Sequence, residues 1–327
     1  MRSGGTRRTP WILLGLLLAA APLSASEPEA APNPLLEVES FGSNPGRLEM
    51  YVHLPPGTVA GAPLVVVAHG CFQTARQVAA SSGWVELADR HRFALLFPQT
   101  SKENEPMGGC FRTWQPQQTR REGGEPVSIR QMIEWMLETY RLDARRVFVT
   151  GMSSGGLVTN VLLATYPELF AAGASLSGYP YDCADSFETV KSCCAGERPL
   201  DSEAWAKLVL DARPGYAGPR PRVAIWHGDA DSLLLPVNLR LQMEQWTRVL
   251  GVDQVPDEVD SIGGHLRERF SDASGEPVVE TFLIHGMGHA LAVDPDGTPA
   301  CGATGDYFSD VDLCAALWIA RWFGIVR

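Results

Sequence analysis

The sequence predicts a single-domain α/β protein built on a doubly wound, mostly parallel β-sheet flanked by helices. Short apolar runs alternate with helix-compatible stretches, and such runs are typical of strands buried on both faces of a parallel sheet. In residues 147–160, four β-favouring residues lead into the pattern Gly-Met-Ser-Ser-Gly and then into an apolar, helix-compatible run. Candidate polar residues also follow directly after predicted strands, where sites form in sheets of this kind.

The first 26 residues are predicted to be a secretory signal peptide. Three arginines form a basic start, residues 11–21 are an apolar run of suitable length, and Ser24, Ala25 and Ser26 offer a cleavage site. The apolar run is too short to span a bilayer comfortably, and no cysteine follows it for a lipid anchor. We therefore expect a secreted protein, extracellular or periplasmic, with no transmembrane anchor.

The remaining chain is predicted to form one domain. Residues 27–45 are a Pro-rich lead-in that we expect to be poorly ordered over 27–36, and residues 46–327 form the α/β domain. With 45% hydrophobic residues, this length suits one large globular unit. No internal repeat and no linker to a second domain are found in it.

The charge of the chain argues against nucleic acid as a partner. The net charge is −11, and residues 1–26 contain three arginines and no acidic residue, so their removal would leave about −14. An acidic protein binds nucleic acid and anionic membrane surfaces poorly. We expect a monomer that binds neither of them.

The domain is predicted to contain seven strands and four helices. The strands are at residues 47–54, 64–68, 93–97, 147–150, 171–176, 222–226 and 278–284, and Pro98 is expected to stop the third. The helices are at residues 75–91, 129–140, 154–166 and 312–323, and the second has apolar residues at helical spacing. Residues 99–125 and 178–215 are predicted to be loops, and long loops are usually functional.

Ser153 is predicted to be a nucleophile at the apex of a strand–turn–helix elbow. The glycines two residues to either side allow the strand and the helix to pass closely. A serine hydroxyl is a weak nucleophile and needs a base that a third group orients. In α/β-hydrolases these groups follow in the order Ser, Asp or Glu, His, and Ser153, Asp231 and His289 satisfy this order, each just past a predicted strand.

Two nearby residues compete with this assignment. Asp229 is the first rival, but Asp231 is preferred because it lies further along the loop that follows the strand. His285 lies at a strand end, where a histidine is more often a packed structural residue, whereas His289 lies on the following loop. The two histidines could also form a metal pair, but their spacing belongs to a helix and the intervening glycines oppose one.

No metal and no cofactor are predicted. Asp294-Pro-Asp296-Gly297 resembles part of a calcium loop, yet a plain turn explains it better. The chemistry expected of a nucleophilic serine requires neither group.

Acyl transfer also needs hydrogen-bond donors for the developing oxyanion. The backbone N–H of Ser154, at the start of the elbow helix, is one candidate. The second should come from the loop after the strand at residues 64–68, and the N–H of Cys71 is the candidate there. We expect His69 to hold this loop by side-chain hydrogen bonds.

The seven cysteines are expected to be mostly structural, because disulfides form in exported proteins. Cys71 with Cys110 would tie the oxyanion loop to the loop at 99–125, and Cys301 with Cys314 would close a short loop onto the last helix. Cys183 is left with either Cys193 or Cys194, and an odd number leaves at least one thiol free or paired with another chain.

Several segments together resemble the polyhydroxybutyrate (PHB) depolymerase family of secreted α/β-hydrolase esterases. The matching segments, spread from about residue 60 to the end, are residues 64–75, 110–116, 121–129, 151–156, 166–174, 178–184, 227–231, 286–290 and 307–311. The resemblance implies a serine esterase in which Ser153, Asp231 and His289 are nucleophile, orienting acid and base. It also implies an oxyanion hole formed by the Cys71 and Ser154 N–H groups, and a Cys71–Cys110 disulfide.

Two features differ from the family pattern. Members that act on solid polymer often carry a linker and a substrate-binding domain, and the sequence shows neither. Members also often have a tryptophan soon after the catalytic histidine, whereas Ala290 and Leu291 follow here. Phe72 and Trp114 are the candidates for aromatic substrate contacts, although packing would explain either residue.

Three functional hypotheses follow. The leading one is a secreted serine esterase that cleaves poly(3-hydroxybutyrate), a related polyhydroxyalkanoate or their oligomers. The second keeps the mechanism and changes the substrate to feruloyl or acetyl esters on plant polysaccharide. The third is a hydrolase-like binding protein without catalysis, which is disfavoured because nucleophile, acid, base and oxyanion loop are all present. The expected partner is a polyester or an ester-decorated polymer.

Overall fold

The computed structural model describes residues 1, 4, 35–198 and 200–327. Residues 34–327 form one compact unit. The predicted signal peptide, apart from residues 1 and 4, lies outside the described residues, as do residues 27–34 of the predicted lead-in. No helix among the described residues has the length and apolar character needed to cross a membrane.

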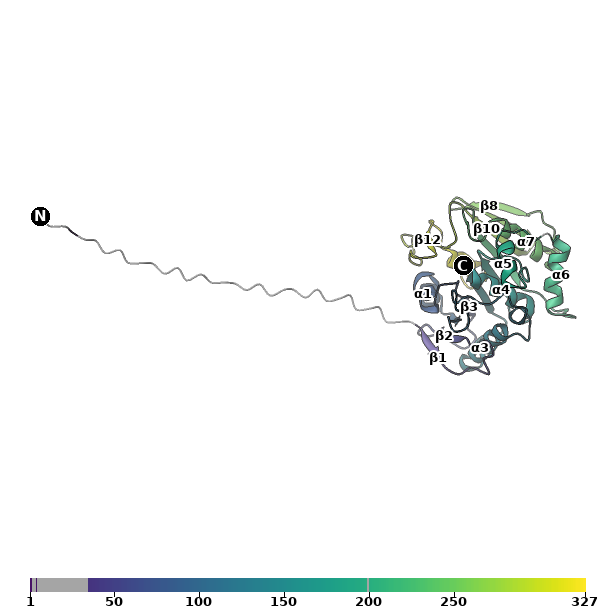
Figure 1. Ribbon diagram of the computed structural model, residues 1–327, viewed down its shortest axis with the longest axis horizontal. Coiled ribbons are helices and arrows are strands. Elements are labelled where there is room, and N and C mark those ends of the chain that lie inside the picture. Colours follow the sequence, from purple (N-terminus) through teal and green to yellow (C-terminus); the bar gives the residue numbers. More distant parts are fainter. Residues whose placement is uncertain (2–3, 5–34, 199) are drawn as a thin grey trace. The chain divides into compact units, whose positions relative to one another are not determined.

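A twisted sheet runs through this unit, and the described part of the chain gives it ten strands in the order β1-β2-β4-β3-β5-β6-β7-β10-β9-β8. Figure 1 shows β1 and β2 at one end and β8 at the other. The six strands β4, β3, β5, β6, β7 and β10 are parallel to one another. Antiparallel strands extend the sheet at both ends. The strands are β1 (Leu36–Val38), β2 (Glu49–His53), β3 (Leu64–Ala68), β4 (Ala94–Gln99), β5 (Val147–Met152), β6 (Ala172–Leu176), β7 (Arg222–Gly228), β8 (Glu258–Ile262), β9 (His265–Ser271) and β10 (Pro277–Ile284).

Helices cover both faces of the sheet, so the predicted doubly wound α/β fold is confirmed. One hydrophobic core packs α1 (Ala75–Ser81), α2 (Trp84–His91) and α8 (Ala315–Trp322) on one face. A second core packs the other face with α3 (Gly124–Tyr140), α4 (Ser154–Thr165), α6 (Ser202–Ala212) and α7 (Val237–Leu250). The parallel strands are buried on both faces, which explains their continuous apolar sequences.

Smaller elements lie near the carboxyl ends of the parallel strands. They are the 3₁₀ turn η1 (Pro116–Gln118), the helix α5 (Phe187–Cys194), and the short parallel pair β11 (Leu291–Val293) and β12 (Phe308–Asp310). A third, small hydrophobic cluster under α5 includes Tyr179, Cys193 and Trp205. The predicted loop at residues 178–215 therefore contains α5 and α6, and that prediction is wrong.

The predicted helix at residues 75–91 is two helices, because the chain breaks at Gly83. This residue has a φ of 82°, in the left-handed region that favours glycine. A Cβ there would lie 2.4 Å from the sulfur of Cys301. The break therefore brings the helix pair close to the segment that follows β11.

Pro98 does not stop β4, which continues to Gln99. Strand β3 pairs with β4 only as far as Leu96, whereas Pro98 faces Met50 of the antiparallel strand β2. A proline removes one N–H from a ladder, and beyond Leu96 the β3 side has no ladder to interrupt. The sequence also gave no sign of β1, which lies within the predicted lead-in at residues 27–45.

Candidate active site

The turn between β5 and α4 holds Ser153 in a strained backbone conformation, with φ 56° and ψ −123°. Its N–H donates to the carbonyl of Leu176 at 2.8 Å. Glycine is required on both sides. A Cβ at Gly151 would lie 2.6 Å from the carbonyl oxygen of Ala68, and one at Gly155 only 2.2 Å from the same atom. The predicted elbow geometry is therefore present at this position.

A histidine and an aspartate from two neighbouring strand ends meet beside this turn. The Nδ1 of His289, after β10, lies 2.7 Å from Oδ2 of Asp231, after β7. The other carboxylate oxygen of Asp231 accepts the N–H groups of Leu233 and Leu234 at 2.9 and 3.0 Å. Because a carboxylate only accepts, the imidazole proton is on Nδ1, and Nε2 is free to act as a base. Ser153 and His289 line the same cleft.

A second histidine, which was not predicted from the sequence, contacts this carboxylate. His227 is fully buried at the end of β7, with Nε2 3.4 Å from Oδ2 of Asp231 and 2.7 Å from the carbonyl oxygen of Leu234. Burial by itself would raise the pKa of Asp231, but the hydrogen bonds from His227 and His289 outweigh it and lower the pKa well below its usual range. Asp231 is therefore ionised at neutral pH.

The rival pair, Asp229 and His285, forms a separate contact. Oδ2 of Asp229 lies 2.8 Å from Nδ1 of His285, and Oδ1 accepts the N–H of Gly286 at 2.7 Å. The His285 side chain is 83% exposed, and the residue is not part of the cleft wall. This pair joins the loops after β7 and β10. The two histidines face different carboxylates, an arrangement that does not suit a shared metal ion.

The loop after β3 places a backbone N–H in the cleft wall. The carbonyl oxygen of Gly70 accepts hydrogen bonds from His69 Nδ1 at 2.8 Å and from the Gln73 N–H at 3.3 Å. Since the N–H of a trans peptide points away from its C=O, these bonds also fix the direction of the Cys71 N–H. His69 Nε2 accepts the Thr100 N–H at 3.1 Å, which assigns the ring proton to Nδ1.

His69 therefore holds the loop as the sequence predicts. Complete burial lowers the pKa of His69 to about 4, an effect that its bond to Gly70 only partly offsets, so the ring is neutral at pH 7. The Gln73 side chain accepts the Gly70 N–H at 2.8 Å. No acceptor among the described residues bonds the Cys71 N–H. The N–H of Ser154, the first residue of α4, is unpaired within its helix.

The loop at residues 99–125 is joined to this region by a disulfide and a backbone hydrogen bond, and a buried carboxylate stabilises the loop itself. A disulfide joins Cys71 to Cys110, and the Phe72 N–H donates to Gly108 at 2.7 Å. Oε2 of the buried Glu105 accepts the Gly108 N–H at 2.7 Å and the Cys110 N–H at 3.3 Å. The far part of the loop is held by Glu125, a second buried carboxylate, which accepts hydrogen bonds from the backbone N–H and the Nε of Arg112 and was not predicted from the sequence.

The cleft above Ser153 has a volume of about 340 Å³ and a mainly apolar wall. Phe72 and Trp114, the two predicted aromatic contacts, both lie in this wall, and their contact with substrate stays a prediction. Trp114 packs edge-on against Phe187 of α5, with ring centroids 5.9 Å apart. Phe187 was missed because α5 lies in a stretch that we predicted to be a loop. The other apolar residues in the wall are Met107, Phe111, Met152, Leu157, Val190, Leu233 and Leu234.

Two further disulfides join Cys183 to Cys193 and Cys301 to Cys314. The sequence left Cys193 and Cys194 as alternative partners for Cys183, and the structure pairs it with Cys193. Cys194 is then the free thiol, half-buried in the cleft wall. Burial raises the pKa of Cys194 to about 11, and the nearby Asp231 adds to the effect, so the thiol is neutral at pH 7.

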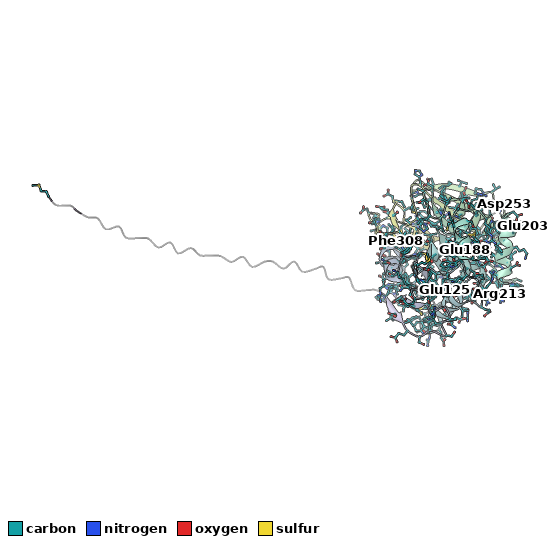
Figure 2. The ribbon with its side chains drawn as sticks, in the orientation of Figure 1. Glu125, Glu188, Glu203, Arg213, Asp253 and Phe308 are labelled. Carbon is teal, nitrogen blue, oxygen red and sulfur yellow. A yellow bond between two sulfur atoms is a disulfide. The ribbon has the colours of Figure 1, made fainter. Side chains whose placement is uncertain are left out.

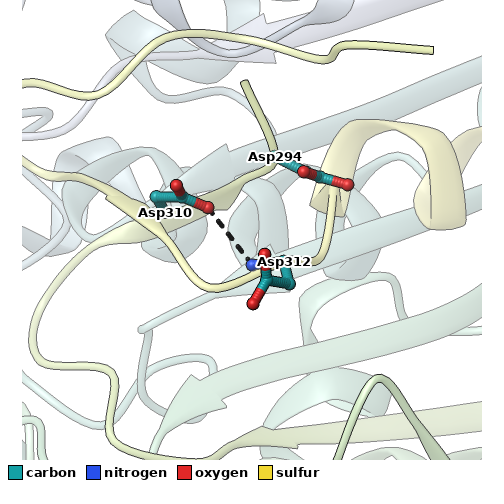
Figure 3. Close-up of side chains that lie close together, drawn as sticks. All are labelled: Asp294, Asp310 and Asp312. Carbon is teal, nitrogen blue, oxygen red and sulfur yellow. Dashed lines mark hydrogen bonds between the residues drawn. The ribbon is translucent and has the colours of Figure 1, made fainter. Parts of the chain in front are cut away.

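Three carboxylates gather beside the β11–β12 pair, as Figure 3 shows for Asp294, Asp310 and Asp312. One oxygen from each lies within 4.8 Å of the others. The Gly297 N–H donates to the Asp294 carbonyl at 3.3 Å, so the segment that resembles a calcium loop forms a turn. Burial and the neighbouring carboxylates raise the pKa of Asp294. The cluster is acidic and largely exposed, and by itself it does not define a metal site.

The fold, the elbow and the His–Asp pair beside it place the protein among the α/β-hydrolases, and its relatives are carboxylic ester hydrolases. Residues 48–264 match the family described as "Esterase PHB depolymerase", so the chain belongs to that family of esterases. The chain is 40% identical to poly(3-hydroxyalkanoate) depolymerase C of Paucimonas lemoignei over 95% of its own length and 75% of that protein.

Esterases named for plant polymers are also similar. Feruloyl esterase B of Neurospora crassa is 37% identical over 75% of this chain and 82% of its own length. The solved structure of acetyl xylan esterase from Aspergillus awamori superposes with a TM-score of 0.74 and 29% identity, covering 89% of this chain and 99% of that one. The chain is therefore an enzyme that hydrolyses carboxylic esters, in a family whose members differ in substrate.

Proposed function

We propose that this enzyme is a secreted serine esterase that hydrolyses poly(3-hydroxybutyrate) or a related polyhydroxyalkanoate through an acyl-enzyme on Ser153. The observation that carries the proposal is the 40% identity to a poly(3-hydroxyalkanoate) depolymerase over 95% of the chain. The mainly apolar wall of the cleft supports it, because the aliphatic units of such polyesters carry no charge.

The proposed mechanism uses the groups that meet at the elbow. His289 Nε2 accepts the Ser153 proton while Oγ attacks the ester carbonyl, and the N–H groups of Cys71 and Ser154 stabilise the oxyanion. The imidazolium, stabilised by Asp231, then gives its proton to the leaving alcohol as the C–O bond breaks. Water, activated by His289, attacks the acyl-enzyme and releases the acid. The low pKa of Asp231 suits this role, because an ionised carboxylate stabilises the imidazolium.

Export is part of the proposal. Residues 1–26 have the sequence of a secretory signal peptide. The three disulfides support an oxidising compartment, since such bonds are rare in cytosolic proteins. N-terminal sequencing of the protein recovered from outside the cytoplasm tests this, and we expect a new N-terminus near residue 26.

Replacing the nucleophile gives the first test of the mechanism. We expect Ser153→Ala to lower ester hydrolysis by about 10⁴-fold or more, with an unchanged thermal unfolding midpoint. A fluorophosphonate probe should label the wild-type protein at Ser153 and leave the variant unlabelled. Substantial turnover by the variant would exclude Ser153 as the nucleophile, and failure of the probe to label wild type would contradict the acyl-enzyme mechanism.

A second substrate class is favoured by the 0.74 TM-score to an acetyl xylan esterase. Under this alternative the same residues cleave acetyl or feruloyl esters on polysaccharide. Hydrolysis of amorphous poly(3-hydroxybutyrate), methyl ferulate and acetylated xylan by one enzyme preparation distinguishes the two. The polyester proposal predicts the highest specific activity on the polyester, and higher activity on either plant ester would replace it with the alternative.

A further inference from the structure

We propose that a second hollow beside the cleft binds the alcohol part of the ester, and that the two together select substrates whose alcohol part has no free carboxylate. The inference rests on the proposed serine esterase mechanism and adds a restriction on substrate charge. For a polyester, it means that bonds inside a chain are cleaved in preference to the bond that releases the carboxyl-terminal unit.

The hollow lies between α1 and the segment before β12. Its volume is about 340 Å³, and it shares Phe72, Gln73 and Tyr307 with the wall of the cleft. In Figure 1, α1 and β12 lie on the same side of the domain. The two cavities are therefore neighbours across one wall, and a substrate longer than the cleft can reach both.

The position of the base decides which part of the ester enters the hollow. His289 packs edge-on against Tyr307, with ring centroids 6.4 Å apart. The base must reach the leaving oxygen, so the alcohol part lies on the His289 side of the scissile bond. Tyr307 belongs to both cavities, which makes the hollow the next space along that direction. The acyl part then occupies the apolar cleft.

The lining of the hollow suits an uncharged, oxygen-containing group. Besides the shared residues, it contains Gln77, Ser81 and Asp306. The side-chain oxygen of Gln77 accepts the Thr74 N–H at 2.9 Å, which leaves the side-chain N–H₂ as the available donor. Amide and hydroxyl donors match the carbonyl oxygens of a neutral ester unit. An exposed carboxylate such as Asp306 repels a free acid at the same place.

The charges around both cavities also disfavour a carboxylate on the substrate. None of the described residues lining the cleft or the hollow is a lysine or an arginine. The carboxylates there are Glu105 and Asp306, and Asp231 lies close behind His289. A substrate carboxylate would therefore lose solvation and find no counter-charge. An ester or an amide at that position has no such cost.

Two matched substrates test the inference. One is the butanoate ester of methyl 3-hydroxybutanoate, and the other is the butanoate ester of 3-hydroxybutanoic acid, which differs by a single negative charge on the alcohol part. We expect wild type to show a kcat/KM at least about tenfold higher for the methyl ester. Added salt should narrow the ratio, because screening weakens repulsion between exposed charges.

Asp306→Asn should raise kcat/KM for the acid by about two- to fivefold and leave the methyl ester nearly unchanged. Asp253→Asn is the matched control: it removes the same charge from an exposed aspartate, and Figure 2 shows Asp253 far from Phe308 at the hollow. Equal rates on the two substrates would overturn the charge selection. Equal effects of the two variants would overturn the assignment to this hollow.

The same measurements separate this inference from the proposed substrate. Discrimination between the two small esters without activity on poly(3-hydroxybutyrate) would refute the polyester proposal and leave the charge selection standing. Activity on the polyester with equal rates on the two small esters would support the polyester proposal and refute the charge selection. Cleavage of neither small ester would contradict the inference, while activity on the polyester would still decide the substrate proposal.

Discussion

Gly155, in the candidate active site, has no room for a side chain. A methyl group at this position would lie 2.2 Å from the Ala68 carbonyl oxygen, and the backbone of β3 cannot move without losing its ladder to β5. We expect Gly155→Ala to destabilise the protein by about 3 kcal/mol or more, measured by denaturant unfolding. Gly288→Ala is the control, because a Cβ at Gly288 meets no atom within 4 Å. Equal stability of the two variants would contradict this account of the elbow.

His69 acts on the proposed oxyanion hole through the Gly70 peptide. His69→Leu removes the bond to the Gly70 carbonyl and the acceptor for the Thr100 N–H. We expect kcat on a soluble ester to fall by about tenfold or more with a smaller change in KM, because the Cys71 N–H loses its alignment in the transition state. His91→Leu, at an exposed histidine at the end of α2 and outside the cleft, should change neither constant by more than about twofold. A loss confined to KM would contradict the positioning role.

The sequence predicted those residues of the candidate site that belong to a local sequence pattern. The glycine spacing around Ser153 and the positions of Asp231 and His289 after strand ends are visible in the chain. His227 and Gln73 were not predicted, because their roles depend on contacts with Leu234 and Gly70 that only the folded loops create.

Among the elements, the loop at residues 99–125 has the most connections to the cleft. The disulfide between Cys71 and Cys110 spans 39 residues and joins this loop to the proposed oxyanion loop. We expect Cys71→Ala/Cys110→Ala to lower the free energy of unfolding by up to about 4 kcal/mol, the loop-closure value for that length. Cys194→Ala removes a free thiol and should cost far less. Comparable losses in denaturant unfolding would show that the 71–110 bridge adds little.

The sequence predicted the central strands and the helix at 129–140 well, because each has a strong hydrophobic pattern. It missed the β8–β9 hairpin, which carries a ladder of charged residues that includes Glu258, Arg267 and Arg269. Such a segment has little apolar sequence of its own and is fixed by pairing with β10. The helix α5 was missed for a related reason, since it packs on only the small cluster around Cys193 and Trp205.

For the whole molecule, two buried groups make opposite contributions to the pH dependence of stability. Burial raises the pKa of Glu125 to about 7 from an ordinary 4.5, although Arg112 opposes the shift. The folded protein therefore holds that proton more tightly, and stability is lost as pH rises from about 4.5 to about 7. The pKa of His69 is lowered from 6.5 to about 4, so its contribution is lost as pH falls through that range.

We expect the two trends to offset each other partly between about pH 4.5 and 6.5. Glu125→Gln keeps an acceptor for Arg112 and removes the titration, so its stability relative to wild type should increase as pH rises from 4.5 to 7. Denaturant unfolding of both proteins at several pH values gives this difference directly. A difference that stays constant with pH would show that Glu125 titrates near its ordinary value.

The absence of lysine and arginine from the described lining of the cleft also bears on how each catalytic cycle ends. Hydrolysis of the proposed acyl-enzyme would turn a neutral ester into an acid, which ionises at neutral pH. The new anion then lies in an apolar space with carboxylates nearby and no cation to retain it. The proposed reaction would thus convert a well-matched substrate into a poorly matched product, and we expect this mismatch to favour product release. Such a cleft favours repeated turnover where free acids accumulate around the enzyme.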